Sequence, residues 1–351
     1  MTPLEQMIRE TIAAEGPMSL ERYMGLCLGH PQHGYYMTRD PLGERGDFVT
    51  APEVSQIFGE LIGIWAIAAW SAMGHPEKFN LIELGPGRGT LMTDMLRVAR
   101  KSAAGFAGAA TVHLVETSPV LRAKQLETLG GQAAWHERLE SVPEGPAIFV
   151  ANEFFDAIPI RQYEKRLGRW YERVMGLKDD TLTINLGPAG LGPLGNDGDI
   201  IEPAPIRTAI AMAIGKRLAK QPGAALIIDY GHLVSAAGDT LQAMKSHGFV
   251  AVTETPGECD ITSHVDFEAL AKALRAGGAE TLPPITQRAF LLAMGLETRT
   301  ANLSARAEPR MRAVLARQAQ RLADDKQMGN LFKVLTATSP KLATPFPFGR
   351  T

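Results

Sequence analysis

Three alternating glycines follow a short apolar run that contains an acid. Residues 81–91 read Leu-Ile-Glu-Leu-Gly-Pro-Gly-Arg-Gly-Thr-Leu, which predicts a buried strand, a sharp turn and the start of a helix. Glycine permits a tight turn and a close approach of the backbone to a ligand. A turn of this kind at the carboxyl end of a strand, with the unpaired N–H groups of the next helix beside it, favours a nucleoside or an anion. The residues expected to line this site are Glu83, Gly85, Gly87 and Gly89.

The spacing of these glycines distinguishes between nucleoside ligands. The dinucleotide fingerprint G-x-G-x-x-G, counted from Gly85, requires glycine at the place where this chain has Thr90. The pattern E-x-G-x-G-x-G instead resembles motif I of class I methyltransferases, which use S-adenosyl-L-methionine. That cofactor lacks a pyrophosphate but carries an α-ammonium, which Glu83 can reach, and a carboxylate, which the turn amides can meet. The alternatives are a plain strand-to-helix turn and another nucleotide site.

A second acid ends the next strand of the pattern. Residues 111–116 are rich in β-forming residues and close with Glu116. A carboxylate at this strand end can accept both ribose hydroxyls of a nucleoside through charge-assisted hydrogen bonds. The alternative is that Glu116 only favours the helix that begins at Ser118 and Pro119. We expect ribose binding.

Polar residues also follow the strand expected at residues 146–151. Asn152, Glu153 and Asp156 stand at its carboxyl end, which should face the glycine turn because parallel strands end at one edge of a sheet. Paired carboxylates indicate a cationic acceptor, and a guanidinium stays charged and can be held by fork-like hydrogen bonds. We expect Asn152 to contribute to the cofactor site. We expect Glu153 and Asp156 to be catalytic, by orienting the acceptor and helping to deprotonate it; a helix cap is the alternative.

A polar loop at residues 46–60 leads into an apolar helix. Helix capping accounts for Pro52 and Glu53, which suit a first helical turn. A lid over the cofactor or the substrate is the competing interpretation, because capping leaves the other polar residues without a role. The residues assigned to this lid are Asp47, Thr50, Glu53 and Gln56.

Asp229 and His264 complete the candidate substrate site. Asp229 ends the strand expected at residues 224–230, where a pocket role and simple turn formation are equally supported. His264 stands in the polar stretch 260–267 and can act as a general base or make a structural hydrogen bond. In the same stretch, Asp266 suits the N-cap of the following helix.

Composition excludes several classes of protein. The chain has 351 residues and a formal net charge of −2, which gives no electrostatic footprint for nucleic acid. Its two cysteines, Cys27 and Cys259, fit neither a disulfide framework nor a metal cluster, and we expect two buried thiols and no metal. The longest uncharged apolar stretch, residues 61–74, falls short of the roughly 18 residues that a membrane span requires. Residues 1–15 lack the pattern of a targeting peptide, so we expect a cytoplasmic protein.

Taken together, segments along nearly the whole chain resemble the MidA-like family of class I methyltransferases. These segments are 46–60, 83–91, 113–119, 151–159, 229–231, 260–267 and 328–335. The resemblance implies an α/β fold with a doubly wound, mostly parallel seven-stranded sheet. We expect an N-terminal helical region with the lid loop at 1–75 and a methyltransferase core at 76–351. Alternating apolar residues predict a β-hairpin insertion at about 160–200.

The resemblance also implies a function. Mitochondrial members of the family are complex I assembly factors that methylate arginine in proteins. We therefore expect S-adenosyl-L-methionine as the cofactor, with Gly85, Gly87 and Gly89 lining it, and a protein partner such as a complex I subunit as the substrate. A small-molecule methyltransferase and a non-catalytic chaperone that retains the cofactor fold are the alternatives.

Overall fold

The computed structural model describes residues 1–41, 43 and 49–348. The chain forms two compact units, and each is built from separated stretches of sequence. The first unit comprises Met1–Phe48, Asp156–Thr208 and Val234–His264; the second comprises Val49–Phe155, Ala209–Leu233 and Val265–Thr351. The boundary expected at residue 75 lies inside the second unit.

The second unit contains one mixed sheet, which confirms the α/β class. Its hydrogen-bonded path runs β15-β17-β10-β5-β2-β3-β4, with β14 beside β10 and β16 beside β17. Among the described residues, β17 pairs antiparallel with β10, β15 and β16, and the other pairs of strands in this sheet are parallel. The strands are β2 (Phe79–Leu84), β3 (Ala110–Val115), β4 (Ala133–His136), β5 (Ala147–Asn152), β10 (Gly223–His232), β14 (Val265–Asp266), β15 (Glu280–Thr281), β16 (Ile285–Thr286) and β17 (Phe332–Thr338).

This sheet has nine strands among the described residues, whereas seven were expected. The additional strands are two-residue pieces, too short to show the alternation of apolar and polar residues by which strands are predicted. The path itself contains seven strands. Along it the chain runs outward from β2 through β3 to β4 and then returns to β5 and β10 on the other side of β2. The direction of winding therefore reverses between β2 and β5.

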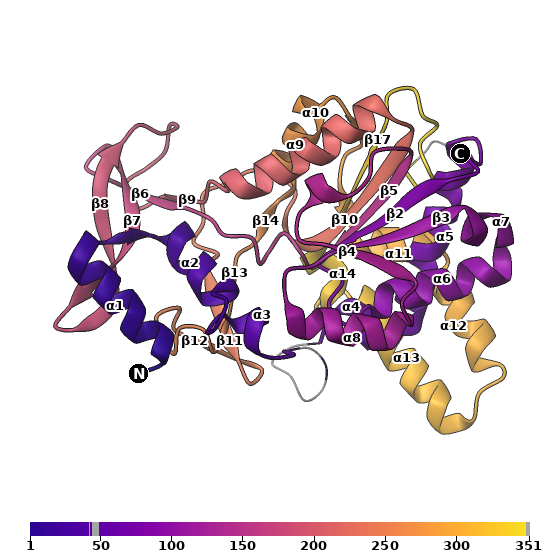
Figure 1. Ribbon diagram of the computed structural model, residues 1–351, viewed down its shortest axis with the longest axis horizontal. Helices are drawn as coiled ribbons and strands as arrows, with labels where there is room; N and C mark the ends of the chain where they lie inside the picture. Colours follow the sequence, from indigo (N-terminus) through magenta and orange to yellow (C-terminus); the bar gives the residue numbers. More distant parts are fainter. Residues whose placement is uncertain (42, 44–48, 349–351) are drawn as a thin grey trace. The chain divides into compact units, whose positions relative to one another are not determined.

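Helices cover both faces of this sheet because its strands alternate their side chains between two apolar cores. In β2, Leu81 belongs to the core shared with α5 and α6, whereas Ile82 and Leu84 belong to the core shared with α9 and α10. Figure 1 shows α9 and α10 on one side of the strands and α5 and α6 on the other. The helices are α4 (Ala51–Val54), α5 (Gln56–Ala72), α6 (Thr90–Ser102), α7 (Ala104–Ala109), α8 (Pro119–Leu129), α9 (Pro205–Lys220), α10 (Phe267–Ala276), α11 (Gln287–Ala293), α12 (Leu296–Ser304), α13 (Pro309–Ala323) and α14 (Met328–Leu331).

Helix α6 follows the glycine turn as expected, and α8 begins at Pro119, where the sequence predicts a helix start. Asp266 caps α10 as expected, because its side chain accepts a hydrogen bond from the Ala269 amide at 2.9 Å. The extra chain length at residues 102–110, ahead of Glu116, predicts a loop, but the structure has helix α7 there. Its two glycines weaken the helical signal, but burial of Phe106 in the core stabilises the helix.

The first unit combines the two expected N-terminal helices with the expected hairpin. A five-stranded sheet has the order β1-β7-β6-β9, with β8 beside β7, and a three-stranded sheet has the order β12-β11-β13. The elements are α1 (Pro3–Glu15), β1 (Met18–Ser19), α2 (Leu20–Gly29), α3 (Tyr35–Thr38), β6 (Gln162–Arg166), β7 (Arg169–Lys178), β8 (Thr181–Gly190), β9 (Ile200–Ile201), β11 (Gln242–Lys245), β12 (Gly248–Val250) and β13 (Asp260–Thr262). The Gly- and Pro-rich residues 186–199 predict a connecting loop, but strand β8 extends into them as far as Gly190.

The apolar core of the first unit holds both cysteines. Cys27 and Cys259 are fully buried and unpaired, as expected, and burial raises the pKa of the Cys27 thiol to about 12. Both thiols are therefore protonated and poorly nucleophilic at neutral pH. Among the described residues, every helix is too short or too polar to cross a bilayer.

Candidate functional site

The glycine turn joins the end of β2 to the first turn of α6. Gly85, Gly87 and Gly89 all have positive φ, at 63°, 55° and 81°, a conformation that other residues rarely adopt. The turn also packs tightly, since a Cβ on Gly85 would lie 2.7 Å from the ring carbon Cδ2 of Phe154. The Gly85 amide donates to the Val115 carbonyl at 3.0 Å, which connects the turn to β3. The three glycines are thus required by the backbone geometry of the turn.

Glu83 lies buried at the end of β2, one strand residue before the turn. Its side chain is 2% exposed, and among the described residues its Oε2 has no hydrogen-bond partner. Burial raises the pKa of Glu83 to about 8, although a hydrogen bond from the Met92 amide opposes this shift. A buried carboxyl without a counter-charge is costly, and a ligand cation would relieve that cost.

Asn152 ends β5, the strand next to β2, and also carries a buried acceptor without a donor. Its Oδ1 has no partner among the described residues, while its Nδ2 donates to Glu153 Oε1 at 3.1 Å. Because the winding of the sheet reverses between β2 and β5, these two strand ends form the place where open α/β sheets bind ligands. The two orphaned oxygens, Glu83 Oε2 and Asn152 Oδ1, fit a ligand that brings hydrogen-bond donors.

Glu116 follows β3 and is connected to the glycine turn through Gln125 of α8. The Glu116 Oε1 accepts from the Ser118 amide at 2.7 Å, and its Oε2 accepts from Gln125 Nε2 at 3.3 Å. The same Nε2 donates to the Gly87 carbonyl at 2.7 Å. Burial raises the pKa of Glu116, and these donors and Arg122 oppose the shift. Gln125 therefore fixes Glu116, the residue expected to bind the ribose, relative to the glycine turn. The local sequence did not indicate this role of Gln125.

Helix α4 is attached to the glycine turn by Glu53. Its Oε1 accepts from Thr90 Oγ1 at 2.5 Å, and its Oε2 lies 3.7 Å from Arg88 Nη1. Thr50 occupies the N-cap position of α4 but makes no side-chain capping bond. Gln56 is exposed at the start of α5. Of the four residues assigned to the lid, Glu53 is thus in contact with the turn, and Asp47 lies outside the described residues.

Glu153 directly follows β5 in a strained backbone conformation. Its φ is +51°, which is uncommon for a residue with a side chain, and its amide donates to the Ile228 carbonyl at 2.9 Å. The Oε1 atom accepts from the Ala51 amide at 2.9 Å as well as from Asn152. The carboxylate is therefore held in one direction, against the first turn of α4.

Asp229 stabilises the turn after β5, which favours the structural interpretation of this residue. It is fully buried, and its two oxygens accept from the Phe155 and Tyr230 amides, each at 2.9 Å. Asp229 lies in the second unit with Glu153, whereas Asp156 and His264 lie in the first.

Arg207 organises the part of the candidate site that belongs to the first unit. Its side chain is 3% exposed and donates to four backbone carbonyls and one hydroxyl. These acceptors are the carbonyls of Asp156 (3.0 Å), Ile158 (3.1 Å), His264 (2.8 Å) and Ser263 (3.5 Å) and the Ser263 hydroxyl (2.6 Å). One guanidinium thus holds Asp156 and His264 in fixed backbone positions, although no local pattern distinguished Arg207 in the sequence.

Comparison with known proteins identifies the family. Residues 61–285 match the model of a family described as S-adenosyl-L-methionine-dependent methyltransferases. The chain belongs to this family. The protein arginine methyltransferase NDUFAF7 of Danio rerio is 36% identical over 92% of this chain and 83% of its own, and that of Homo sapiens is 35% identical over 95% and 82%. The structure is also similar to the crystal structure of a protein from Burkholderia thailandensis bound to S-adenosyl-homocysteine. The two compare with a TM-score of 0.83 at 28% sequence identity, over 95% of this chain and 91% of that one.

Membership confirms the methyltransferase activity and the cofactor that the glycine spacing and the resemblance predicted. The residues at the reversal of the sheet fit this cofactor, since the orphaned Glu83 oxygen suits an α-ammonium. The expected cytoplasmic location is wrong by this comparison, because the relatives are named as mitochondrial proteins. Targeting segments are recognised separately from a folded core, so the sequence of the core does not report the compartment.

Cofactor binding to the methyltransferase is expected to release a proton from Glu83. At pH below about 7 the buried carboxyl, with its pKa of about 8, is protonated in the ligand-free protein. A ligand ammonium beside it favours the ionised form, so affinity for S-adenosyl-homocysteine should rise as pH increases from about 5.5 to 7. Titration calorimetry across this range, in buffers of different ionisation enthalpy, measures both the affinity and the proton released. The Glu83→Gln variant should lose this proton release, and an unchanged release in the variant would contradict the assignment.

Proposed function

We propose that this methyltransferase transfers a methyl group from S-adenosyl-L-methionine to a guanidinium nitrogen of arginine in a protein partner, such as a complex I subunit. The observation that carries the proposal is the strained conformation of Glu153 at the end of β5. Backbone strain of this kind costs roughly 1–3 kcal/mol and is concentrated at functional sites. In this conformation the Glu153 carboxylate accepts from Asn152 Nδ2 at the end of β5, and the Oδ1 of the same Asn152 side chain has no partner among the described residues. The names of the NDUFAF7 relatives agree with an arginine substrate.

In this proposal the protein supplies binding and orientation. The cofactor provides an activated methyl group on a sulfonium. Glu83, Glu116, Asn152 and the three glycines hold the cofactor, while Glu153 binds the guanidinium and localises its charge. Fork-like hydrogen bonds to carboxylates fix the plane of a guanidinium. One of its nitrogens would form a bond to the methyl carbon as the bond from that carbon to the sulfonium sulfur breaks. S-adenosyl-homocysteine would be the leaving group, and Glu153 would accept the proton that the nitrogen loses.

The experiment measures transfer of a radiolabelled methyl group to recombinant complex I subunits, followed by amino-acid analysis of the product. The expected product is methylarginine. We expect Glu153→Gln and Asp156→Asn each to reduce kcat by roughly 100-fold or more, as removal of an acid-base group does, with cofactor affinity within a factor of about three. The matched control is Glu140→Gln, because Glu140 is exposed and distant in sequence from the site. Near wild-type turnover in both variants, or methylation of a residue other than arginine, would overturn the proposal.

The strand order supports a further structural proposal, that the sheet is the doubly wound class I core with additions. The seven-membered path reverses once, and helices from both sides pack on it. In this interpretation β14 and β16 are short additions to the seven-stranded core.

A further inference from the structure

Helix α13 presents a line of arginines on one exposed face. Arg310, Arg317 and Arg321 lie at spacings that place them on the same side of a helix, with Val314 between them. All three arginines are exposed, and none has an acidic partner in the part of the chain that the structure describes. The line from Arg310 to Arg321 extends about 16 Å along the helix axis.

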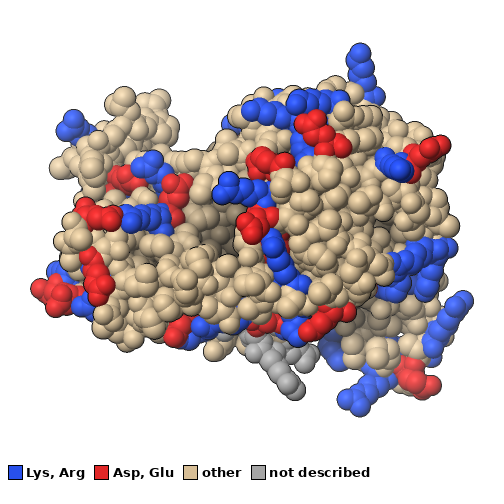
Figure 2. All heavy atoms as spheres, in the orientation of Figure 1, with Lys and Arg blue, Asp and Glu red and all other residues tan. Residues whose placement is uncertain are grey.

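The surrounding helical hairpin is basic although the whole chain is slightly acidic. Residues 296–323 contain six arginines and two glutamates, whereas the chain has a net charge of −2. Figure 2 shows lysine and arginine side chains at the lower right, where Figure 1 places α12 and α13. This concentration of one sign of charge attracts a partner of the opposite sign.

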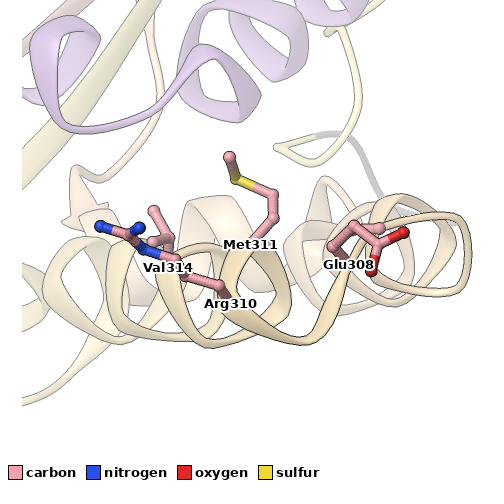
Figure 3. Close-up of a pocket in the computed structure, with 5 residues that line it drawn as sticks. Glu308, Arg310, Met311 and Val314 are labelled. Carbon is pink, nitrogen blue, oxygen red and sulfur yellow. The ribbon is translucent and has the colours of Figure 1, made fainter.

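An apolar hollow of about 670 Å³ adjoins this line at the start of α13. Its lining residues are Ala307, Glu308, Arg310, Met311 and Val314. Figure 3 shows Met311 and Val314 on one side of the helix, with the guanidinium of Arg310 extending past Val314. Met311 is 51% exposed, so its side chain is accessible to a partner at this hollow.

The hairpin is fixed rigidly to the second unit. Arg299 of α12 donates to both oxygens of the buried Glu60 at 2.7 and 3.1 Å, and Arg97 of α6 donates to the same carboxylate at 2.6 Å. Leu315 and Leu322 of α13 are buried in the core, and α13 also packs against α4. A partner bound on α13 would therefore be held at a fixed place relative to α4 and the glycine turn.

We propose that the exposed face of α13 binds an acidic segment of the protein substrate, about three helical turns long, that inserts an apolar side chain into the hollow. The assignment of this segment to the substrate rests on the proposed arginine methylation. The three arginines match carboxylates spaced along such a segment, and the hollow matches one side chain near its end. Nucleic acid would use the charge but not the apolar hollow.

The test uses a fluorescent helical peptide of about 18 residues that carries glutamates at the matching spacings and one leucine. Fluorescence anisotropy measures its affinity for the full chain at 0.15 M salt. We expect binding to weaken at least tenfold in the triple variant Arg310→Glu, Arg317→Glu, Arg321→Glu, and to weaken when the leucine of the peptide is replaced by serine. The matched control is Lys78→Glu, Lys101→Glu, Lys216→Glu, which makes the same change of charge at exposed positions elsewhere in the second unit and should bind as the wild type does.

Further measurements separate this proposal from the proposed function. Affinity for S-adenosyl-homocysteine should be unchanged in both triple variants, because neither set of residues belongs to the cofactor site. The proposed binding on α13 would be contradicted if peptide binding weakened equally in the two triple variants. It would also be contradicted if a single-stranded oligonucleotide bound more tightly than the peptide. Methylation of a residue other than arginine would overturn the proposed function. The effect of the α13 variant on peptide binding would still show whether the exposed face of α13 binds the acidic peptide.

Discussion

Replacement of Glu116 by alanine is expected to weaken binding of S-adenosyl-L-methionine and S-adenosyl-homocysteine by on the order of 10²–10⁴-fold, or roughly 3–6 kcal/mol for two charge-assisted hydrogen bonds. The carboxylate is 8% exposed and its pKa is raised by burial, so water does little to satisfy it. Its protein donors are the Ser118 amide and the Gln125 side chain. A ribose with two adjacent hydroxyls supplies the remaining donors.

Titration calorimetry with both compounds measures this loss of affinity. A second variant distinguishes a lost contact with the ligand from a disturbed fold. Glu116→Gln keeps one acceptor oxygen for the Ser118 amide and should retain part of the affinity. The matched control is Glu127→Ala on the next helix, where an exposed carboxylate pairs with Lys124 and should not contribute to binding. Affinity of Glu116→Ala within a factor of about three of the wild type would show that the ribose is held elsewhere.

Replacement of Arg207 by methionine is expected to reduce stability and turnover together. Methionine keeps much of the apolar stem but removes the guanidinium that donates to the carbonyls of Ile158, Ser263 and His264. The Asp156 carbonyl loses one of its two donors and keeps the Ser263 amide at 3.2 Å. Each buried acceptor that loses a partner costs about 1–3 kcal/mol, so the free energy of unfolding should fall by roughly 3–5 kcal/mol. Because Asp156 and His264 then lose their fixed backbone positions, we expect kcat to fall by at least roughly tenfold while cofactor affinity is preserved.

Arg217 offers a matched control near the opposite end of α9. Its guanidinium also donates to backbone carbonyls, those of Leu139 at 3.2 Å, Val142 at 3.0 Å and Pro143, but none of these belongs to the candidate site. Arg217→Met should therefore lower stability without changing kcat of the folded enzyme. Denaturant unfolding and steady-state kinetics on both variants test this distinction. Equal kcat for Arg207→Met and Arg217→Met would mean that Arg207 acts on the fold alone.

The cofactor site could be predicted from the sequence because its parts are local patterns. The three glycines occupy adjacent alternate positions, and the turn they form needs positive φ at each of them. Glu83, Glu116 and Asn152 stand at strand ends, and strand ends of a parallel sheet meet at one edge whatever the remaining structure. Helix α6 could be predicted for the same reason, since the glycine turn and the helical spacing of apolar residues after it are local features.

Tertiary structure alone decided which polar groups serve a ligand and which serve the fold. Asp229 and Glu83 are both acids at strand ends, yet Asp229 is satisfied by two amides while Glu83 keeps an unpartnered oxygen. The roles of Gln125 and Arg207 could not be predicted, because Gly87 and the other residues that accept their hydrogen bonds lie mostly far away in the sequence. The expected loop at 102–110 became helix α7 for a related reason, because burial of Phe106 outweighs the local preference of its glycines. Local patterns thus determined which residues belong to the candidate site, and long-range packing decided the hydrogen-bond partners of each side chain.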